Sequence, residues 1–164
     1  MGTTITVGIA DLKVGKGDDV LVTYALGSCV GICLYDAEKK IAGLAHIMLP
    51  LSKDASAASK ATPENRRRYA DTGITELIQE MSFAGASTKN LTAKIAGGAQ
   101  MFSSSSAVFN IGERNVEAVK KMLAAYRIKI IAEETGLNYG RTVFFHADTG
   151  IMEVRAATRE TKMV

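Results

Sequence analysis

Two apolar runs on either side of a short polar turn constrain the fold more than any other feature of the chain. Residues 30–35 and 41–49 are rich in apolar side chains, and the turn between them reads Asp-Ala-Glu-Lys-Lys. Extended apolar runs joined by a turn of this kind are typical of a β-hairpin. We therefore predict that the two runs pair as neighbouring strands.

The rest of the chain alternates between strand and helix patterns. Thr62 and Pro63 begin a predicted helix whose apolar face repeats to Met81, and a second helix begins near Gly112. The charged tail from Thr158 is expected to fray. Further strands are predicted over residues 4–12, 20–24, 91–96, 128–132, 142–145 and 151–155, the last two forming a hairpin. About eight strands and two helices predict an α+β domain in which helices cover sheet faces.

Length and charge bound the class of protein. The chain has 164 residues and a net charge of +3, and one domain typically has roughly 100–200 residues, so residues 1–164 are expected to form one domain. The small charge excess is spread along the chain, whereas a nucleic-acid-binding protein needs a clustered basic surface. The sequence has no apolar run long enough to span a membrane and no signal-peptide pattern. We expect a cytoplasmic protein that neither inserts into a membrane nor binds nucleic acid.

Cys29 is the candidate nucleophile. It follows Gly27 and Ser28 at the end of a strand, where small residues let a substrate approach the backbone. Free N–H groups at such a bend would lower the thiol pKa and could hold an oxyanion. The alternative is that Cys29 only fills space, because free cysteines are among the most buried residues. Cys33 is interpreted as core: four extended residues span roughly 13 Å, which is beyond disulfide reach, and no second cysteine pair completes a metal site.

His46 is the candidate partner of Cys29. It lies in the strand that pairs with the strand after Cys29, so the hairpin can bring imidazole and thiol together as an activated nucleophile. Such a pair needs a third group to orient the imidazole, and Thr23 can supply its hydroxyl or its carbonyl. A histidine on an apolar face is also often a core residue. The competing histidine, His146, lies beside a hairpin turn, where we expect it to be exposed.

Two further segments are candidates for binding. Gly97 and Gly98 lack the Lys-Ser/Thr ending of a phosphate loop; they form either a strand-to-loop transition or a rim where another backbone approaches. Met101 and Phe102 form either a partner-binding patch or a buried plug. The arginine run at residues 66–68 predicts a solvated face, with contact to an acidic partner as the alternative.

Several segments, in a fixed order, resemble the CheD family of bacterial chemoreceptor glutamine deamidases. The resemblance runs from about residue 5 to residue 155 and is carried by residues 26–30, 33–36, 43–50, 69–71, 94–99, 101–102, 111–115 and 140–143. It implies two packed β-sheets flanked by helices, similar to the catalytic domains of deamidating bacterial toxins.

The resemblance also implies a cysteine-dependent protein-glutamine glutaminase that needs no metal or cofactor. Cys29 corresponds to the nucleophile, His46 to the histidine and Thr23 to the third member of the site. We add Gly27, Ser28, Gly97 and Gly98 as candidate oxyanion or substrate-binding residues. The implied reaction converts glutamine side chains of methyl-accepting chemoreceptors to glutamate through a thioester, with release of ammonia. The resemblance also implies hydrolysis of glutamate methyl esters as a minor activity of the same chemistry.

The implied partners are the cytoplasmic domains of chemoreceptors and the CheC phosphatase, and the free chain is expected to be a monomer. Two other hypotheses stay open. One is a non-catalytic adaptor that binds receptors and CheC with a structural Cys29. The other is a thiol redox sensor that uses Cys29 and Cys33.

Overall fold

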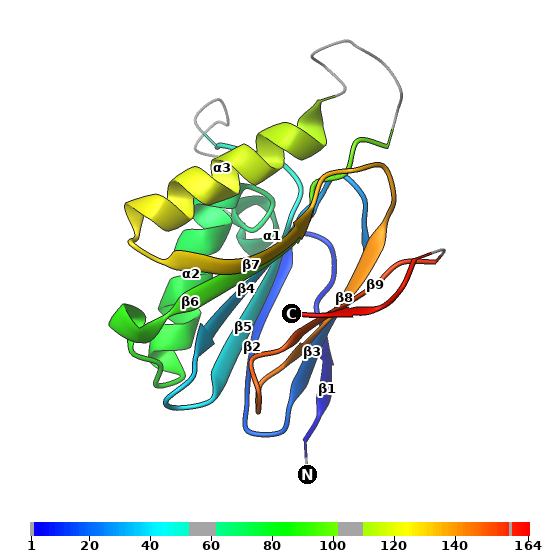
Figure 1. The fold of residues 1–164 in the computed structure, drawn as a ribbon. Helices are drawn as coiled ribbons and strands as arrows, with labels where there is room; N and C mark the ends of the chain where they lie inside the picture. The colour runs from blue at the N-terminus through cyan, green and yellow to red at the C-terminus, as the bar shows by residue number, and fades with distance from the viewer. Residues whose placement is uncertain (1, 53–61, 102–109, 158) are drawn as a thin grey trace.

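Two five-stranded sheets pack face to face, and helices cover the outer face of one of them (Figure 1). The structure is a computed structural model, described here for residues 2–52, 62–101, 110–157 and 159–164. The first sheet has the order β1 (Thr4–Thr6), β3 (Val20–Leu26), β8 (Arg141–His146), β9 (Met152–Arg155), β10 (Lys162–Met163). The second has the order β2 (Asp11–Lys16), β5 (Ile41–Ile47), β4 (Val30–Asp36), β6 (Thr92–Gly97), β7 (Lys129–Thr135). This confirms the predicted α+β fold of two packed sheets flanked by helices; the likeness to toxin domains stays a prediction.

The predicted central hairpin is confirmed. Strands β4 and β5 pair antiparallel from Val30 opposite Ile47 to Asp36 opposite Ile41. Both strands are buried along their whole length, because one face meets the helices and the other meets the first sheet. A strand covered on both faces needs apolar side chains at nearly every position, which explains the continuous apolar runs.

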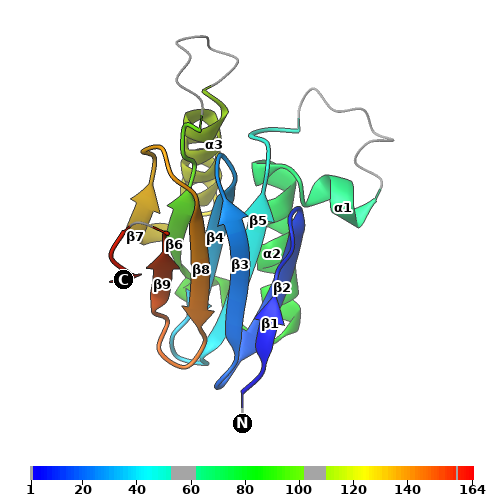
Figure 2. The ribbon, with the colours of Figure 1, turned by 90° about the vertical axis from the view of Figure 1, so that its right-hand side faces the viewer.

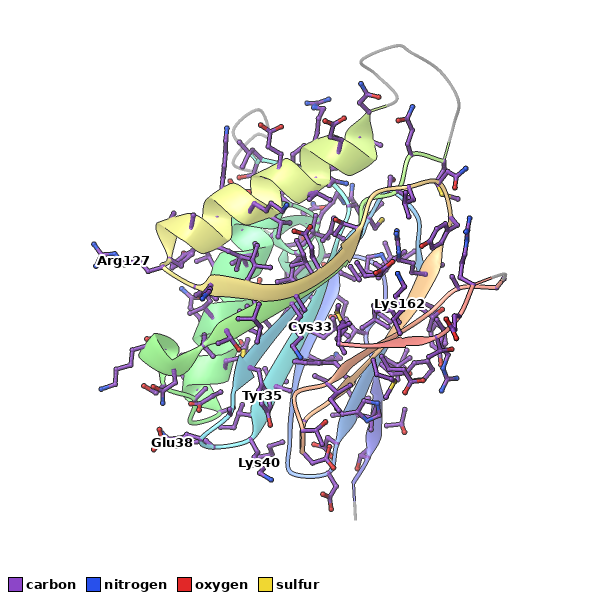
Figure 3. The ribbon with its side chains drawn as sticks, in the orientation of Figure 1. Cys33, Tyr35, Glu38, Lys40, Arg127 and Lys162 are labelled. Carbon is purple, nitrogen blue, oxygen red and sulfur yellow. The ribbon has the colours of Figure 1, made fainter. Side chains whose placement is uncertain are left out.

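The interior is divided into two cores by the second sheet. Val30, Ile32 and Leu34 face the helices, where they join the apolar face of α2 (Ala70–Phe83) and α3 (Ile111–Ala125). Cys33 and Tyr35 face the other way, into the core between the sheets; Figure 3 shows both side chains on this side of β4. Cys33 is 1% exposed, which confirms its interpretation as a core residue.

The predicted strand over residues 4–12 is wrong as a single element. Residues 4–6 form β1, which pairs parallel with β3 in the first sheet, whereas β2 pairs antiparallel with β5 in the second. The chain crosses between the sheets at residues 7–10, and Ala10 has a positive φ of 55°. Alternating apolar residues continue through the crossover, so the pattern alone could not reveal the change of sheet.

The predicted helix from Thr62 is interrupted. Thr62 caps α1 (Pro63–Arg66) by accepting a hydrogen bond from the Asn65 N–H, but Tyr69 is extended and α2 begins only at Ala70. The backbone at this break is used by the chain that leaves β5: the N–H groups of Met48 and Leu49 both donate to the carbonyl of Arg68. A tertiary contact therefore overrides the local helical pattern.

The prediction of a frayed tail is also wrong for its last residues. Lys162 and Met163 form β10, which pairs antiparallel with β9. Lys94 donates a hydrogen bond of 2.8 Å to the Val164 carbonyl, which ties the same segment to the second sheet. No helix in the described ranges is long and apolar enough to cross a membrane.

The topology gathers four chain segments at one end of the molecule. The connection from β3 to β4, the end of β5 and the end of β6 lie opposite the N-terminus, together with the connection from β7 to β8 (Figure 2). Val30, the first residue of β4, is paired with Ile47 on one side and Gly97 on the other. Cys29 therefore lies between two strand ends.

The helical core predicts a clear contrast between two positions of α2. Leu77 is fully buried, whereas Phe83 is 86% exposed. Leu77→Ala should lower the free energy of unfolding by about 2–5 kcal/mol, because it removes buried contacts and leaves a cavity, whereas Phe83→Ala should change it by about 0.5 kcal/mol or less. Urea unfolding measures both, and equal losses would contradict the assignment of this core.

Candidate active site

The carbonyl groups of the loop that carries Cys29 accept hydrogen bonds from other segments of the chain. The Gly27 carbonyl accepts from the Ala99 N–H and the Cys29 carbonyl from the Gly98 N–H, each at 2.8 Å. The Ser28 carbonyl accepts from the Asn115 side chain at 2.9 Å. Within the described ranges, no other residue accepts a hydrogen bond from the N–H of Ser28 or Cys29. These two N–H groups of the loop are therefore available to donate to a bound group.

Gly97 and Gly98 make this arrangement sterically possible. Gly97 has a φ of +107°, and a Cβ atom there would lie 2.2 Å from the Cys29 carbonyl oxygen. Gly98 has a φ of +63°, and a Cβ there would lie 2.2 Å from Val116. Because the Gly98 N–H already donates to Cys29, the geometry gives these glycines a supporting position behind the loop. The Gly97 carbonyl is itself held by the Gly136 N–H at 3.0 Å.

His46 faces the same core as Cys29. It lies in β5 directly opposite Gly31 of β4, two residues after Cys29, so the two side chains occupy the same face of the sheet at diagonal positions. Diagonal neighbours of an antiparallel pair are about 7–8 Å apart at the backbone, within reach of long side chains. Gly31 has no side chain between them, and a Cβ atom there would lie 3.1 Å from Cδ1 of Leu26. The hairpin thus brings the imidazole next to the Cys29 loop.

A chain of two hydrogen bonds fixes the imidazole. The Thr23 hydroxyl donates to the Val7 carbonyl at 2.8 Å, and its oxygen lies 2.7 Å from Nδ1 of His46. A hydroxyl has one proton, so once that proton is given to Val7, the Thr23 oxygen must accept from Nδ1–H. His46 is therefore the Nδ1–H tautomer, with a lone pair on Nε2. Within the described part of the chain, Nε2 is buried and has no hydrogen-bond partner.

Burial keeps both members of the pair neutral. It lowers the pKa of His46 to about 4, and it raises the pKa of the Cys29 thiol from its ordinary value. The backbone N–H of Cys29 does lower the thiol pKa, as the sequence predicts, but the loss of water around the sulfur outweighs it. The prediction that the thiol pKa is lowered is therefore wrong: the resting site contains a thiol and a neutral imidazole.

His146 is remote from this site. It pairs with Val20 at the start of β3, whereas Thr23 and Leu26 lie toward the other end of the strand. It is half-buried rather than exposed, because Nε2 of His146 lies 3.2 Å from a carboxylate oxygen of Glu153. The contact partner of His146 therefore lies within the first sheet and not at the Cys29 loop.

Of the two candidate partner-binding residues, Met101 and Phe102, the structure describes only Met101. Met101 is 48% exposed and packs on the loop, since a Cβ at Gly27 would lie 3.3 Å from its Cγ. Phe102 lies outside the described residues, so its predicted role stays a prediction.

Arg67, in the predicted solvated face, forms ion pairs with Asp11 and Glu76 of the same chain, at 3.1 and 2.8 Å, rather than lying free in solvent. No cluster that could hold a metal ion is found among the described side chains.

Sequence reasoning missed three supporting groups. The Val7 carbonyl carries no side-chain signal at all. Asn115 lies four residues before Val119 on the buried face of α3, so its helical spacing could have marked it as a buried amide. Arg141 is 2% exposed and donates to the Gly136 carbonyl at 2.9 Å, beside the segment that supports Gly97. Its signals were its position at the start of an apolar strand and its place in a segment that carries the family resemblance.

Comparisons with known proteins show the family to which this chain belongs. The family model described as CheD chemotactic sensory transduction matches residues 48–156. A probable chemoreceptor glutamine deamidase CheD of Caldanaerobacter subterraneus is 50% identical over 162 residues, covering 98% of this chain and 97% of the relative. The corresponding protein of Lachnoclostridium phytofermentans is 46% identical, and the chemoreceptor glutamine deamidase CheD of Halalkalibacterium halodurans is 45% identical, each covering 100% of both chains. The chain belongs to the CheD family, which confirms the resemblance.

The buried imidazole predicts how stability depends on pH. The pKa of His46 is about 4 in the folded state against an ordinary 6.5, so between these values the unfolded chain binds more protons. The free energy of unfolding should therefore fall as the pH decreases from 6.5 toward 4, with a contribution from His46 of up to about 3 kcal/mol. Urea unfolding at several pH values should show this slope in the wild type and in His146→Gln, but not in His46→Gln. The same slope in both variants would contradict a neutral, buried His46.

The raised thiol pKa predicts slow alkylation at neutral pH. In a Cys33→Ala background, the rate at which iodoacetamide modifies Cys29 should keep rising through pH 9, the ordinary pKa of a thiol, because the thiolate is the reactive form. Mass spectrometry of the modified protein follows the rate. A plateau near pH 7 would instead indicate a stabilised thiolate.

Proposed function

We propose that this chain is a cysteine-dependent protein-glutamine deamidase that acts on chemoreceptors. The observation that carries the proposal is the Thr23–His46 hydrogen bond, which leaves the Nε2 atom of a buried imidazole with a lone pair and no hydrogen-bond partner among the described residues. A thiol beside an oriented imidazole is an activated nucleophile. The relatives are named chemoreceptor glutamine deamidases, and we assign the same substrate class to this chain.

In the first half-reaction, Nε2 of His46 takes the thiol proton as Sγ of Cys29 bonds to the carboxamide carbon. The carbonyl oxygen becomes an oxyanion, which the free N–H groups of Ser28 and Cys29 are placed to stabilise. The imidazolium then gives its proton to the amine nitrogen, the C–N bond breaks, and ammonia leaves. A thioester between Cys29 and the former glutamine side chain remains.

In the second half-reaction, His46 takes a proton from water as the water oxygen bonds to the thioester carbon. The C–S bond breaks, and the proton returns to the sulfur. The product is a glutamate side chain. The same two half-reactions accept a glutamate methyl ester, with methanol in place of ammonia as the leaving group, which supports the proposal of a minor methylesterase activity.

The depressed pKa of His46 suits the departure of ammonia. An imidazole whose conjugate acid has a pKa of about 4 is a weak base but a strong proton donor. Once it has taken the thiol proton, it therefore passes that proton readily to the departing nitrogen. Thr23 contributes a neutral oxygen rather than a carboxylate, so it orients the ring without stabilising the imidazolium strongly.

The surroundings of the loop fit a protein substrate. Large apolar side chains are exposed on segments at the same end of the molecule: Ile9 is 59% exposed, Tyr24 52% and Leu137 63%. Exposed large apolar side chains are typical of protein-binding surfaces. We propose that this surface receives the receptor segment around the glutamine, that CheC binds at this end, and that the free chain is a monomer.

The alternatives receive less support. A non-catalytic adaptor would not need a thiol, an oriented imidazole and free N–H groups in one place. A redox sensor would need Cys33 to react, but Cys33 is fully buried and burial strongly raises its pKa. The names of the relatives also describe enzymes.

The proposal predicts ammonia release from a cytoplasmic chemoreceptor fragment. The wild type should convert specific glutamines to glutamates, as seen by peptide mass mapping, and Cys29→Ala should be inactive because no other described thiol reaches the site. Cys33→Ala, the matched thiol control, should keep its activity. Release by Cys29→Ala would remove Cys29 from the role of nucleophile, and no release by the wild type would contradict the proposed function.

A further inference from the structure

One buried amide joins the two segments that carry the reacting groups. Asn115, in the second turn of α3, is fully buried, and its Nδ2 group donates to the carbonyls of Ser28 and Met48, at 2.9 Å each. Ser28 precedes Cys29 in the chain, and Met48 follows His46 by two residues. A single NH₂ group therefore spans the gap between the nucleophile loop and the histidine strand.

The Asn115 amide connects the two segments beyond the point where the pairing of β4 and β5 ends. The β4–β5 ladder ends at Val30 opposite Ile47. Beyond it, the N–H groups of Met48 and Leu49 donate to Arg68 instead of to the Cys29 loop. Among the described residues, no backbone hydrogen bond connects residues 27–29 with residues 48–49, so Asn115 supplies the connection that the strands lack.

The packing of α3 holds the Asn115 amide in a fixed position. Asn115 shares the buried face of α3 with Val119 and Leu123. The helix start is pressed onto the segment behind the Cys29 loop, since a Cβ at Gly112 would lie 2.3 Å from the Ala99 carbonyl oxygen. A packed helix with a fixed rotamer constrains a hydrogen-bonding group far more closely than a loop does.

The chemistry requires an amide at this position. Two carbonyl oxygens must be satisfied by one side chain, and the NH₂ group of Asn offers two N–H donors in a fixed plane. An aspartate would place an acceptor oxygen against both carbonyls, and a leucine of similar size would donate to neither. Asn115 also leaves its own Oδ1 buried with no hydrogen-bond partner among the described residues, which costs stability.

We propose that Asn115 is a positioning residue, which sets the spacing between Cys29 and His46 by bridging the carbonyls of Ser28 and Met48. This inference rests on the proposed function. It assigns Asn115 no contact with substrate. Its effect is on the geometry of proton transfer and attack, where a misplacement of about 1 Å can lower the rate by about a hundredfold.

The test compares Asn115→Leu and Asn115→Asp with Val119→Ala, a matched control on the same buried face of α3. Both Asn115 variants should lower kcat on a chemoreceptor fragment by about tenfold to a hundredfold, with KM changed less than about threefold. Val119→Ala should lower the thermal midpoint of unfolding while keeping kcat near that of the wild type. Asn115→Asp keeps the size of the side chain but not its donors, and circular dichroism of each variant ensures that kcat is compared only between folded proteins.

A second readout does not depend on the substrate. Without the bridge, the Cys29 loop should open to water, and the alkylation profile of Cys29 should move toward the ordinary thiol pKa of 9.0 in the Asn115 variants but not in Val119→Ala. This arm still tests Asn115 if the wild type releases no ammonia, an outcome that would contradict the proposed function alone. Wild-type kcat and an unchanged alkylation profile in the Asn115 variants, or equal losses in Val119→Ala, would overturn the positioning role.

Discussion

The hydroxyl of Thr23 has one proton and two neighbours, and the candidate active site depends on which neighbour receives it. The Val7 carbonyl receives it at 2.8 Å, so the His46 imidazole must donate to the same oxygen at 2.7 Å. Thr23 belongs to the first sheet and His46 to the second, while Val7 lies in the crossover between them. The correct tautomer therefore exists only when the two sheets are packed, and the fold and the site are formed by the same contact.

The same packing sets the electrostatics of the site. With water excluded, the pKa of His46 falls to about 4 and that of Cys29 rises, so the resting pair is neutral. A neutral pair does not hold a ready thiolate; proton transfer must accompany attack. The neutral thiol is a weak nucleophile at rest, but the imidazolium that forms during attack readily protonates the departing nitrogen. This balance fits an amide, whose leaving group must be protonated before it departs.

Part of the fold and part of the candidate site could be predicted from the sequence, and there are physical reasons why the rest could not. The β4–β5 hairpin is local, so its apolar runs and polar turn were sufficient to pair the strands and to place His46 near Cys29. The crossover at residues 7–10 and the break before Ala70 depend on contacts with distant strands, which no local pattern records. The thiol pKa was predicted in the wrong direction because burial of the Cys29 loop depends on Gly97, Gly98 and α3, all far away in the chain.

The most direct test is the protonation state of His46, read from long-range ¹H–¹⁵N correlations of the imidazole in a His146→Gln background. The account predicts a neutral ring at neutral pH, with the proton on Nδ1 and a bare Nε2, and no protonation of Nε2 until the pH approaches about 4. A proton on Nε2 with a bare Nδ1, or an imidazolium at neutral pH, would contradict it. The first result would mean that Thr23 does not orient His46 as the base for Cys29, and the second that burial does not keep the imidazole neutral and available as that base.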